Sequence, residues 1–576
     1  MFCAGLLALL LHKSDGPPSC PQLLAPERLT HSSAARSASV ADAATGAPIG
    51  PRWLVAALAA ALLLARLLSA SYGAFYEGDE ISIASGIAGI AHDNAAFLYR
   101  YGPQVGYYRL VAGLTALFGG AVLTIPVVMT TLSVLAGAFI PLAGLYAFRG
   151  DLTKVERWLL AGTLAASPIL WTSSRYGNTA MPAVALVVAG VLLLSNRPQR
   201  LGEIVALALF GLAILVRADS VLASGAIGVV LWRNHGSFRA ALGRMLALGV
   251  ILAATYGALF AIDPYMLQIF GDVRAHLTTP DRTRFFELLI WAVSPFPLVY
   301  AILGLRDLEP ARRWLLAILA AWCVPSMGFY FAATTTPRYF ILPAFAIAIA
   351  SAVGMSNVAR IASRWPRLAW AVVLFTASLH MFVGLSNFYP NVKRGWLTDA
   401  RVGSHDGDVL AGAFLYNSYV QHRPALTHPR VGQLVPVDRS YITAFDALAR
   451  HGHHGENIVL IYSGGEGHVV HFFAQTAGAT VSNKSRTYRS DDAVSYDIGG
   501  ARLTALGLYT FDSDTAPRVP VKAGDVVWLL NRSPGNSPDT ESRIAAFMPP
   551  GLALSTAARL HDTPLLWTYR VEQTAP

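Results

Sequence analysis

The chain has 576 residues, of which 54% are hydrophobic and only 14% are charged, and its mean hydropathy is +0.46. Because soluble domains carry roughly 25% charged residues, this composition excludes a wholly soluble protein, and it also excludes a disordered chain, a collagen-like fibre and a coiled coil. The 44 Lys and Arg exceed the 34 Asp and Glu by 10, an excess that in a membrane protein reflects cytoplasmic loops and lipid headgroups rather than nucleic acid.

Residues 1–50 are rich in Ala, Ser and Pro, and we predict a disordered tail there. The apolar stretch 3–11 is shorter than the ~20 residues that span a bilayer, and it lacks the basic start of a secretory signal. The three cysteines, Cys3, Cys20 and Cys323, offer neither a disulfide framework nor a CxxC metal pair.

Closely spaced apolar runs begin at Trp53 and continue to about residue 388, which predicts a membrane module over residues 51–392 with 11–13 transmembrane helices. Some runs are short, so some of these helices are expected to be short or tilted. The long run 107–148 holds either one crossing with a re-entrant piece or three short crossings.

Basic residues gather in alternate connections of this module, and the positive-inside rule places those connections in the cytoplasm. The five clusters are Arg149/Lys154/Arg157, Arg197/Arg200, Arg233/Arg239/Arg244, Arg306/Arg312/Arg313 and Arg360/Arg364/Arg367. The N-terminus is then inside. The loops 73–106 and 263–284 and everything after residue 389 are outside.

Residues 393–576 mix polar and apolar residues and predict one extracytoplasmic α/β or α+β domain. Ile458–Tyr462 and Val526–Leu530 are typical of buried strands, and Val469–Ala477 is typical of a helix. The glycine-rich stretch 463–467 between the first strand and this helix lacks both nucleotide-binding spacings.

The first outer loop carries three carboxylates within four residues, Glu77, Asp79 and Glu80. The apolar spacing of Ile81–Ala91 predicts a helix lying in the membrane interface, with Asp79 and Glu80 at its N-terminal end, where the helix dipole favours negative charge. Two interpretations stand side by side: the acids are caps and solvated loop residues, or one of them is a general base that takes a proton from a hydroxyl.

Three arginines on the predicted outer side, Arg175, Arg217 and Arg338, each lie at the end of an apolar run. A guanidinium suits bidentate binding of phosphate, whereas a lone arginine at a helix end more often reaches toward lipid headgroups. Three arginines lie at one depth, opposite a loop that carries carboxylates. Phosphate binding and contact with lipid headgroups therefore explain them about equally well. Charges at this boundary do not predict a mid-membrane ion path.

These residues occur in an order that resembles the GT-C superfamily of polyprenyl-phosphate-sugar-dependent glycosyltransferases, in particular its protein O-mannosyltransferase and lipid A aminoarabinose transferase branch. The resemblance covers about residues 50–390. Its segments are Tyr76-Glu77-Gly78-Asp79-Glu80, Gly102-Pro103 to Tyr107-Tyr108 with Leu117-Phe118-Gly119, Ser174-Arg175-Tyr176 to Met181-Pro182, Val216-Arg217-Ala218-Asp219, the 263–284 loop with His276, and Arg338-Tyr339 to Leu342-Pro343.

The resemblance implies a polytopic helical fold and an inverting transfer of a monosaccharide from a polyprenyl-phosphate donor to a lipid, glycan or protein acceptor. It implies that Asp79 is the base, with Glu80 orienting it or raising its pKa, and that Arg217 and Arg338 bind the lipid phosphate. Arg175, Tyr107, Tyr108, Tyr339 and His276 complete the set of candidate substrate-binding residues. A divalent metal is compatible with such chemistry, but no residue pattern indicates one. The product belongs to a cell-envelope glycan, and the enzyme to the cytoplasmic membrane.

Two positions depart from the family pattern. Met181 replaces a second acid that relatives often carry before Pro182, and Gly102 replaces a lysine that some carry before the loop-closing proline. Arg175 offers a substitute cation. These departures keep open a scaffold with this fold but no activity. A transporter or lipid flippase is a separate alternative to the enzyme.

Overall fold

A computed structural model describes residues 52–70, 78–91, 101–174, 177–196, 200–262, 293–306, 312–333, 340–361, 457–462, 474–481, 494–507, 519–530, 544–555 and 566–574, with isolated residues between and after these ranges (285, 289, 368, 370–373, 375, 376, 472, 542, 558 and 559). The tail 1–50, the loop 263–284 and residues 393–456 lie outside them. The predicted boundaries at residues 50 and 392 thus remain predictions.

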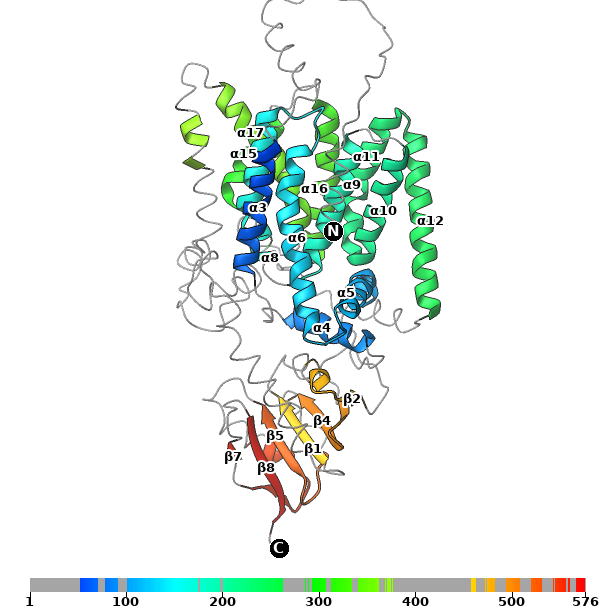
Figure 1. The fold of residues 1–576 in the computed structure, drawn as a ribbon, viewed down its shortest axis with the longest axis vertical. Helices are drawn as coiled ribbons and strands as arrows, with labels where there is room; N and C mark the ends of the chain where they lie inside the picture. Colours follow the sequence, from blue (N-terminus) through cyan, green and yellow to red (C-terminus); the bar gives the residue numbers. More distant parts are fainter. Residues whose placement is uncertain are drawn as a thin grey trace, which may run out of the picture.

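The apolar runs of the sequence form a bundle of helices (Figure 1). Its members are α3 (Arg52–Ser69), α5 (Val105–Leu117), α6 (Thr124–Tyr146), α7 (Lys154–Ala166), α8 (Pro168–Ser173), α9 (Ala180–Ser195), α10 (Arg200–Val216), α11 (Ser224–His235), α12 (Phe238–Ile262), α15 (Pro295–Arg306), α16 (Arg313–Ala333) and α17 (Ile341–Ile361). Among the described residues, α6, α12, α16 and α17 are long and apolar enough to cross a membrane. The chain is a multi-pass membrane protein, and the total of 11–13 crossings stays a prediction.

The run 107–148 divides into two helices of different length. Helix α6 has 23 residues, whereas α5 has 13 and therefore spans only about 20 Å, less than the ~30 Å hydrocarbon core of a bilayer. This division agrees with the alternative of one crossing accompanied by a shorter piece.

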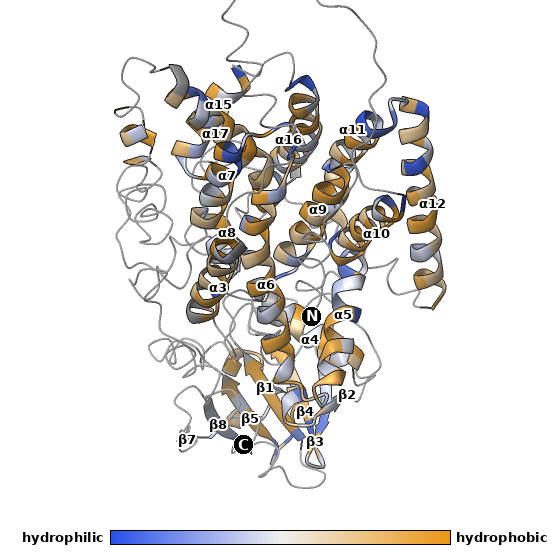
Figure 2. Cartoon of the chain, turned by 45° about the horizontal axis from the view of Figure 1, so that its top comes forward, coloured by the Kyte–Doolittle hydropathy of each residue, from blue (hydrophilic) through white to orange (hydrophobic). Residues whose placement is uncertain are grey.

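Four of the five basic clusters meet at one end of the bundle. Arg233 pairs with Asp151 (Nη1–Oδ2 2.5 Å), and Arg312 pairs with Glu156 (Nη1–Oε1 2.8 Å). Glu203, in the first turn of α10, pairs with both His235 and Arg244. Figure 2 shows the hydrophilic ends of α11, α12 and α16 together. Their common side is confirmed, while its assignment to the cytoplasm stays a prediction.

Beyond the opposite end of the bundle lies a mixed sheet built by the C-terminal region (Figure 1). Its strand order is β2-β3-β4-β1-β5-β8-β6, with β7 added alongside β8. The strands are β1 (Asn457–Tyr462), β2 (Thr480–Val481), β3 (Val494–Ile498), β4 (Ala501–Gly507), β5 (Val526–Leu530), β6 (Leu552–Leu554), β7 (Ala558–Arg559) and β8 (Leu566–Gln573).

The central strands β4, β1 and β5 are parallel, and the outer pairings are antiparallel. Both predicted strands, β1 and β5, are confirmed, and their continuous apolar sequence fits strands covered on both faces. Residues 474–476 are helical, inside the predicted helix Val469–Ala477.

Helix α4 (Gly78–Ala91) lies between the bundle and the sheet (Figure 1). It packs against α5 and α6, and from the other side Gln475 donates from Nε2 to the Ser85 carbonyl and hydroxyl oxygens at 3.4 Å each. The predicted helix is confirmed. Residues 82–89 are all buried, so this stretch of the helix has no face open to water, and its place in the membrane interface stays a prediction.

Candidate functional site

The structure describes only part of the predicted site. Asp79 and Glu80 are the second and third residues of α4, so the expected helix start is confirmed for their backbone. Their side chains lie outside the described part of the chain, as do Arg175, His276, Arg338 and Tyr339. Their predicted roles stay predictions. Arg217, Tyr107 and Tyr108 are described.

Arg217 occupies the break between two helices. Helix α10 ends at Val216, Arg217 is extended (φ −158°, ψ 111°), and the 3-10 helix η2 (Ala218–Ala223) follows. The side chain turns back on its own loop, and Nε donates to Asp219 Oδ1 at 2.7 Å. Arg217 is only 9% exposed, so little water screens this pair. The break in the helix thus fixes the guanidinium at the rim of the bundle.

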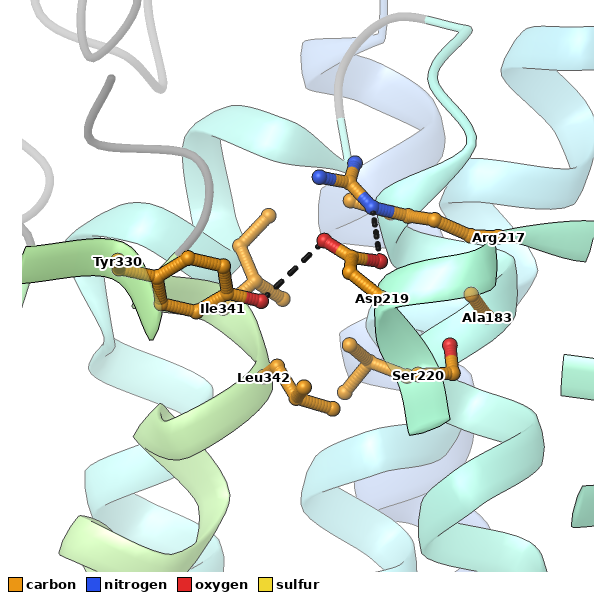
Figure 3. Close-up of a pocket in the computed structure, with 9 residues that line it drawn as sticks. Ala183, Arg217, Asp219, Ser220, Tyr330, Ile341 and Leu342 are labelled. Carbon is orange, nitrogen blue, oxygen red and sulfur yellow. Dashed lines mark hydrogen bonds and ion pairs between the residues drawn. The ribbon is translucent and has the colours of Figure 1, made fainter. Parts of the chain in front are cut away.

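A third group from a distant segment joins this pair. The hydroxyl of Tyr330, in the last turns of α16, donates to Asp219 Oδ2 at 3.2 Å. The three side chains line a small pocket together with Ser220 and with residues that begin α9 and α17, namely Ala180, Ala183, Val184, Ile341 and Leu342. In Figure 3 the two Nη atoms of Arg217 point away from Asp219. The carboxylate therefore sets the direction in which the guanidinium faces.

The other two predicted arginines belong to segments that end at this pocket. Arg338 precedes Ile341 by three residues and Arg175 precedes Ala180 by five. Since consecutive Cα atoms are 3.8 Å apart, the Cα atoms lie at most about 11 and 19 Å from those pocket residues. The covalent chain thus keeps Arg175 and Arg338 within reach of the pocket, and the convergence of the three guanidinium groups stays a prediction.

Buried hydrogen bonds fix both ends of the turn that carries Arg175. Before it, Ser174 Oγ accepts from Arg66 Nη1 at 2.8 Å. After it, the Asn178 N–H donates to Ser133 Oγ at 3.2 Å, and Asn178 Oδ1 accepts from the Met181 N–H at 3.0 Å. The turn is therefore anchored to α3 on one side and to α6 on the other.

Tyr107 and Tyr108 lie in the first turn of α5 and are fully buried. Tyr108 packs edge-on against Tyr101, with ring centroids 5.3 Å apart. A Cβ on Gly106 would come within 2.7 Å of the Leu215 carbonyl carbon, so α5 approaches α10 just before Arg217. Both tyrosines are buried in the packing around α5, and their contact with substrate stays a prediction.

The two departures from the family pattern have clear structural settings. Met181 is fully buried, and its Cε lies 3.6 Å from the position of a Cβ on Gly137, so this position contributes packing and no charge. Gly102 begins the short 3-10 helix η1 (Gly102–Gln104) and is buried. Within the described residues the pocket carboxylate is Asp219, and no group of three metal-ligating side chains gathers.

Sequence reasoning did not assign roles to Asp219, Tyr330 or Arg66. For Asp219 the sequence offered one signal, which is that an acid follows the candidate phosphate ligand Arg217 by two residues. Tyr330 and Arg66 gave none, because their partners are 111 and 108 residues away along the chain.

The fold has counterparts among solved structures, whereas no protein-family model and no curated protein matches the sequence. ArnT from Cupriavidus metallidurans bound to undecaprenyl phosphate is similar with a TM-score of 0.56 and 13% identity, over 90% of this chain and 98% of that one. The apo state of the same protein gives 0.53 and 13%, over 90% and 97%. The arabinofuranosyltransferase AftD from Mycobacteria gives 0.48 and 15%, over 91% of this chain and 42% of that one.

Proposed function

Because the chain has the GT-C fold, we propose that it is an inverting glycosyltransferase that moves a monosaccharide from a polyprenyl-phosphate donor to an acceptor hydroxyl at the outer face of the cytoplasmic membrane. The observation that carries the proposal is the Arg217 guanidinium, held by Asp219 beside a pocket where α9, η2, α16 and α17 meet. The same end of α10 contacts α5, which in turn packs against α4, the helix whose second residue is Asp79.

The chemistry follows from a base and a set of cations. The Asp79 carboxylate takes the proton of the acceptor hydroxyl, and the acceptor oxygen forms a bond to the anomeric carbon from the face opposite the phosphate. The bond between that carbon and the phosphate oxygen breaks, and its electron pair leaves with the polyprenyl phosphate. Arg217 and Arg338, with Arg175, bind this phosphate and stabilise the charge that develops on it, which is the largest electrostatic contribution available.

Two further features support a lipid-linked donor. The similar ArnT structure holds undecaprenyl phosphate, and its fold matches over 98% of its length. A donor with a long isoprenoid tail also requires a protein embedded in the bilayer. The N-terminus faces the cytoplasm and the C-terminal domain lies outside, where lipid, glycan or protein hydroxyls of the cell envelope serve as acceptors.

The distribution of charge argues against a transporter or flippase. In α6, α9, α10, α12, α16 and α17 every Asp, Glu, Lys and Arg lies within about two turns of a helix end. An ion or proton path would place such groups at mid-membrane depth. Buried Met181 is the observation that favours a non-catalytic member of the fold, and the experiment below decides that alternative.

To test the proposal, the full-length protein is reconstituted in proteoliposomes with a panel of undecaprenyl-phosphate hexoses and pentoses and with envelope extracts as acceptors. Released undecaprenyl phosphate is quantified by mass spectrometry. Asp79→Asn should lower the release rate by about 10²–10⁴-fold, the usual contribution of a general base. Asp497→Asn, at an exposed position of β3, is the matched control and should leave the rate unchanged.

Undiminished release by correctly inserted Asp79→Asn protein would remove Asp79 from the role of base. Absence of release from every donor by the unmodified protein would favour the scaffold, and movement of intact donor across the vesicle membrane would favour the flippase.

A further inference from the structure

Arg66 is a cation placed entirely inside the protein. It belongs to the last turn of α3 and is 0% exposed. Its Nη1 donates to the Leu170 carbonyl at 3.1 Å and to Ser174 Oγ at 2.8 Å, and its Nη2 donates to the Ala165 carbonyl at 3.4 Å. Its Cζ lies 4.0 Å from the centroid of the Trp171 ring.

These contacts explain why a buried charge is tolerated. An isolated charge in an apolar interior is very costly unless hydrogen bonds and opposite partial charges compensate it. The Ala165 carbonyl belongs to the last turn of α7, where the helix dipole is negative, and the Trp171 ring presents a negative π face. The site is therefore built around a guanidinium, whose planar, branched donors reach three segments at once.

The location of these contacts connects two predicted functional segments. Ser174 immediately precedes Arg175, and Asn178 on the far side of the turn is held by Ser133. On its own side, α3 ends at Ser69, and the next described helix along the chain is α4, which begins with Gly78 and Asp79. Arg66 thus ties the helix that precedes the carboxylate to the turn that carries the predicted phosphate ligand.

We infer that Arg66 is a positioning residue, which holds Ser174 and the end of α8 in register with the outer end of α3. It thereby positions the chain that leads on to the pocket residue Ala180 for binding of the donor phosphate. This inference rests on the proposed function. It concerns binding of the donor and not the proton transfer. Loss of Arg66 consequently weakens donor binding more than it slows the chemical step.

The test compares Arg66→Met, Arg66→Lys and Ser174→Ala in the proteoliposome assay. Arg66→Met should raise the KM for the undecaprenyl-phosphate sugar about tenfold, with kcat within about threefold of the unmodified protein, since one tenfold step corresponds to loss of about 1.4 kcal/mol of binding. Arg66→Lys keeps the charge but places all its donors on one nitrogen, so it cannot reach the separate acceptors of the guanidinium and should restore only part of the affinity. Ser174→Ala removes one acceptor of Arg66 together with the hydroxyl's own bond to the Trp171 carbonyl (2.8 Å), and it should raise the donor KM about threefold.

Arg157→Met is the matched control. Arg157 is also buried, at 5% exposure, and donates from Nη1 to the Leu145 carbonyl at 3.4 Å, but it lies at the basic end of the bundle. Both Arg→Met variants should lower the unfolding temperature, whereas only Arg66→Met should change the donor KM. Binding of undecaprenyl phosphate alone, measured by native mass spectrometry, should weaken in the same order as the donor KM rises.

The outcomes separate the proposed glycosyltransferase function from the positioning role of Arg66. An inactive unmodified protein that does not bind undecaprenyl phosphate would overturn the proposed function. An active protein in which Arg66→Lys and Ser174→Ala keep the normal donor KM would overturn the positioning role alone, and these two variants decide it even if Arg66→Met does not fold.

Discussion

The two ends of the helix bundle contain closely similar Arg–Asp pairs in different settings. Arg233–Asp151 and Arg217–Asp219 have contacts of 2.5 and 2.7 Å, and in both pairs the side chains are less than a fifth exposed. The first pair joins residues 82 positions apart and ties two connections together. The second joins residues two positions apart and lines a pocket. Distance and burial alone therefore do not distinguish the pair that we propose to be functional from the other, and the two differ instead in chain separation and in the adjacent cavity.

The largest expected effect is a loss of stability at the end of the bundle where the basic clusters meet. Glu156 is 0% exposed, pairs with Arg312 and accepts from the Thr153 N–H at 2.8 Å in a capping box at the start of α7. Glu156→Ala leaves the partly buried Arg312 without this partner and also removes the capping box, and together these losses should cost about 3–5 kcal/mol of unfolding free energy. Thermal unfolding in detergent measures the loss, and donor turnover of the remaining folded protein should be normal. A small change in unfolding temperature would show that this end does not hold the bundle together.

The next effect contrasts the two arginines directly. Arg217→Gln should lower kcat/KM for the donor by about 10²–10³-fold, the loss typical of one charge-stabilising donor. Arg233→Gln removes an equally short ion pair and should lower the unfolding temperature while kcat/KM stays within about threefold. Steady-state release of undecaprenyl phosphate gives both values. Equal losses of kcat/KM in the two variants would show that the two ends of the bundle do not differ in function.

A smaller effect, at the Arg217–Asp219 pair, separates the orientation of the guanidinium from the charge of the carboxylate. Asp219→Ala removes the acceptor that directs the Arg217 guanidinium and should lower kcat/KM about tenfold, or about 1.4 kcal/mol. Asp219→Asn keeps an acceptor oxygen and loses the charge, so it should lie between Asp219→Ala and the unmodified protein. If Asp219→Ala instead binds donor more tightly, the carboxylate competes with phosphate rather than positioning its ligand.

The smallest effect concerns the contact between α16 and η2. Tyr330→Phe removes one hydrogen bond of 3.2 Å to a carboxylate and should lower kcat/KM about threefold. Tyr300→Phe is the matched control, because the Tyr300 hydroxyl bonds Thr376 Oγ1 at 2.9 Å and does not line the pocket. Identical kinetics in the two variants would exclude Tyr330 from the site.

Local sequence patterns predicted the elements of this fold well, whereas contacts between distant segments escaped them. The apolar run Ile458–Tyr462 predicted a central strand because such strands are covered on both faces. The helix after Gly78 was predicted from its apolar spacing, but the C-terminal domain covers its second face through residues about 390 positions further along the chain. No local periodicity contains that information.

The same limit applies to the candidate site. Arg217 was identified because a cation ends an apolar run on the side with few basic residues, a property of the local sequence. Its orientation depends on Asp219 and Tyr330, and the second of these joins the site only through the packing of α16 on η2. A buried arginine such as Arg66 looks like an ordinary helix-end cation until its carbonyl partners are known.

The 390-residue separation between Ser85 and Gln475 also sets an order of events during biosynthesis. Helix α4 is synthesised early, but its outer wall is translated near the end of the chain and, in the proposed orientation, must first be exported. We therefore expect a nascent chain to have its membrane helices in place while α4, which carries the proposed base, still lacks its contact with Gln475. Such a delay would keep an unfinished polypeptide from consuming scarce activated sugar.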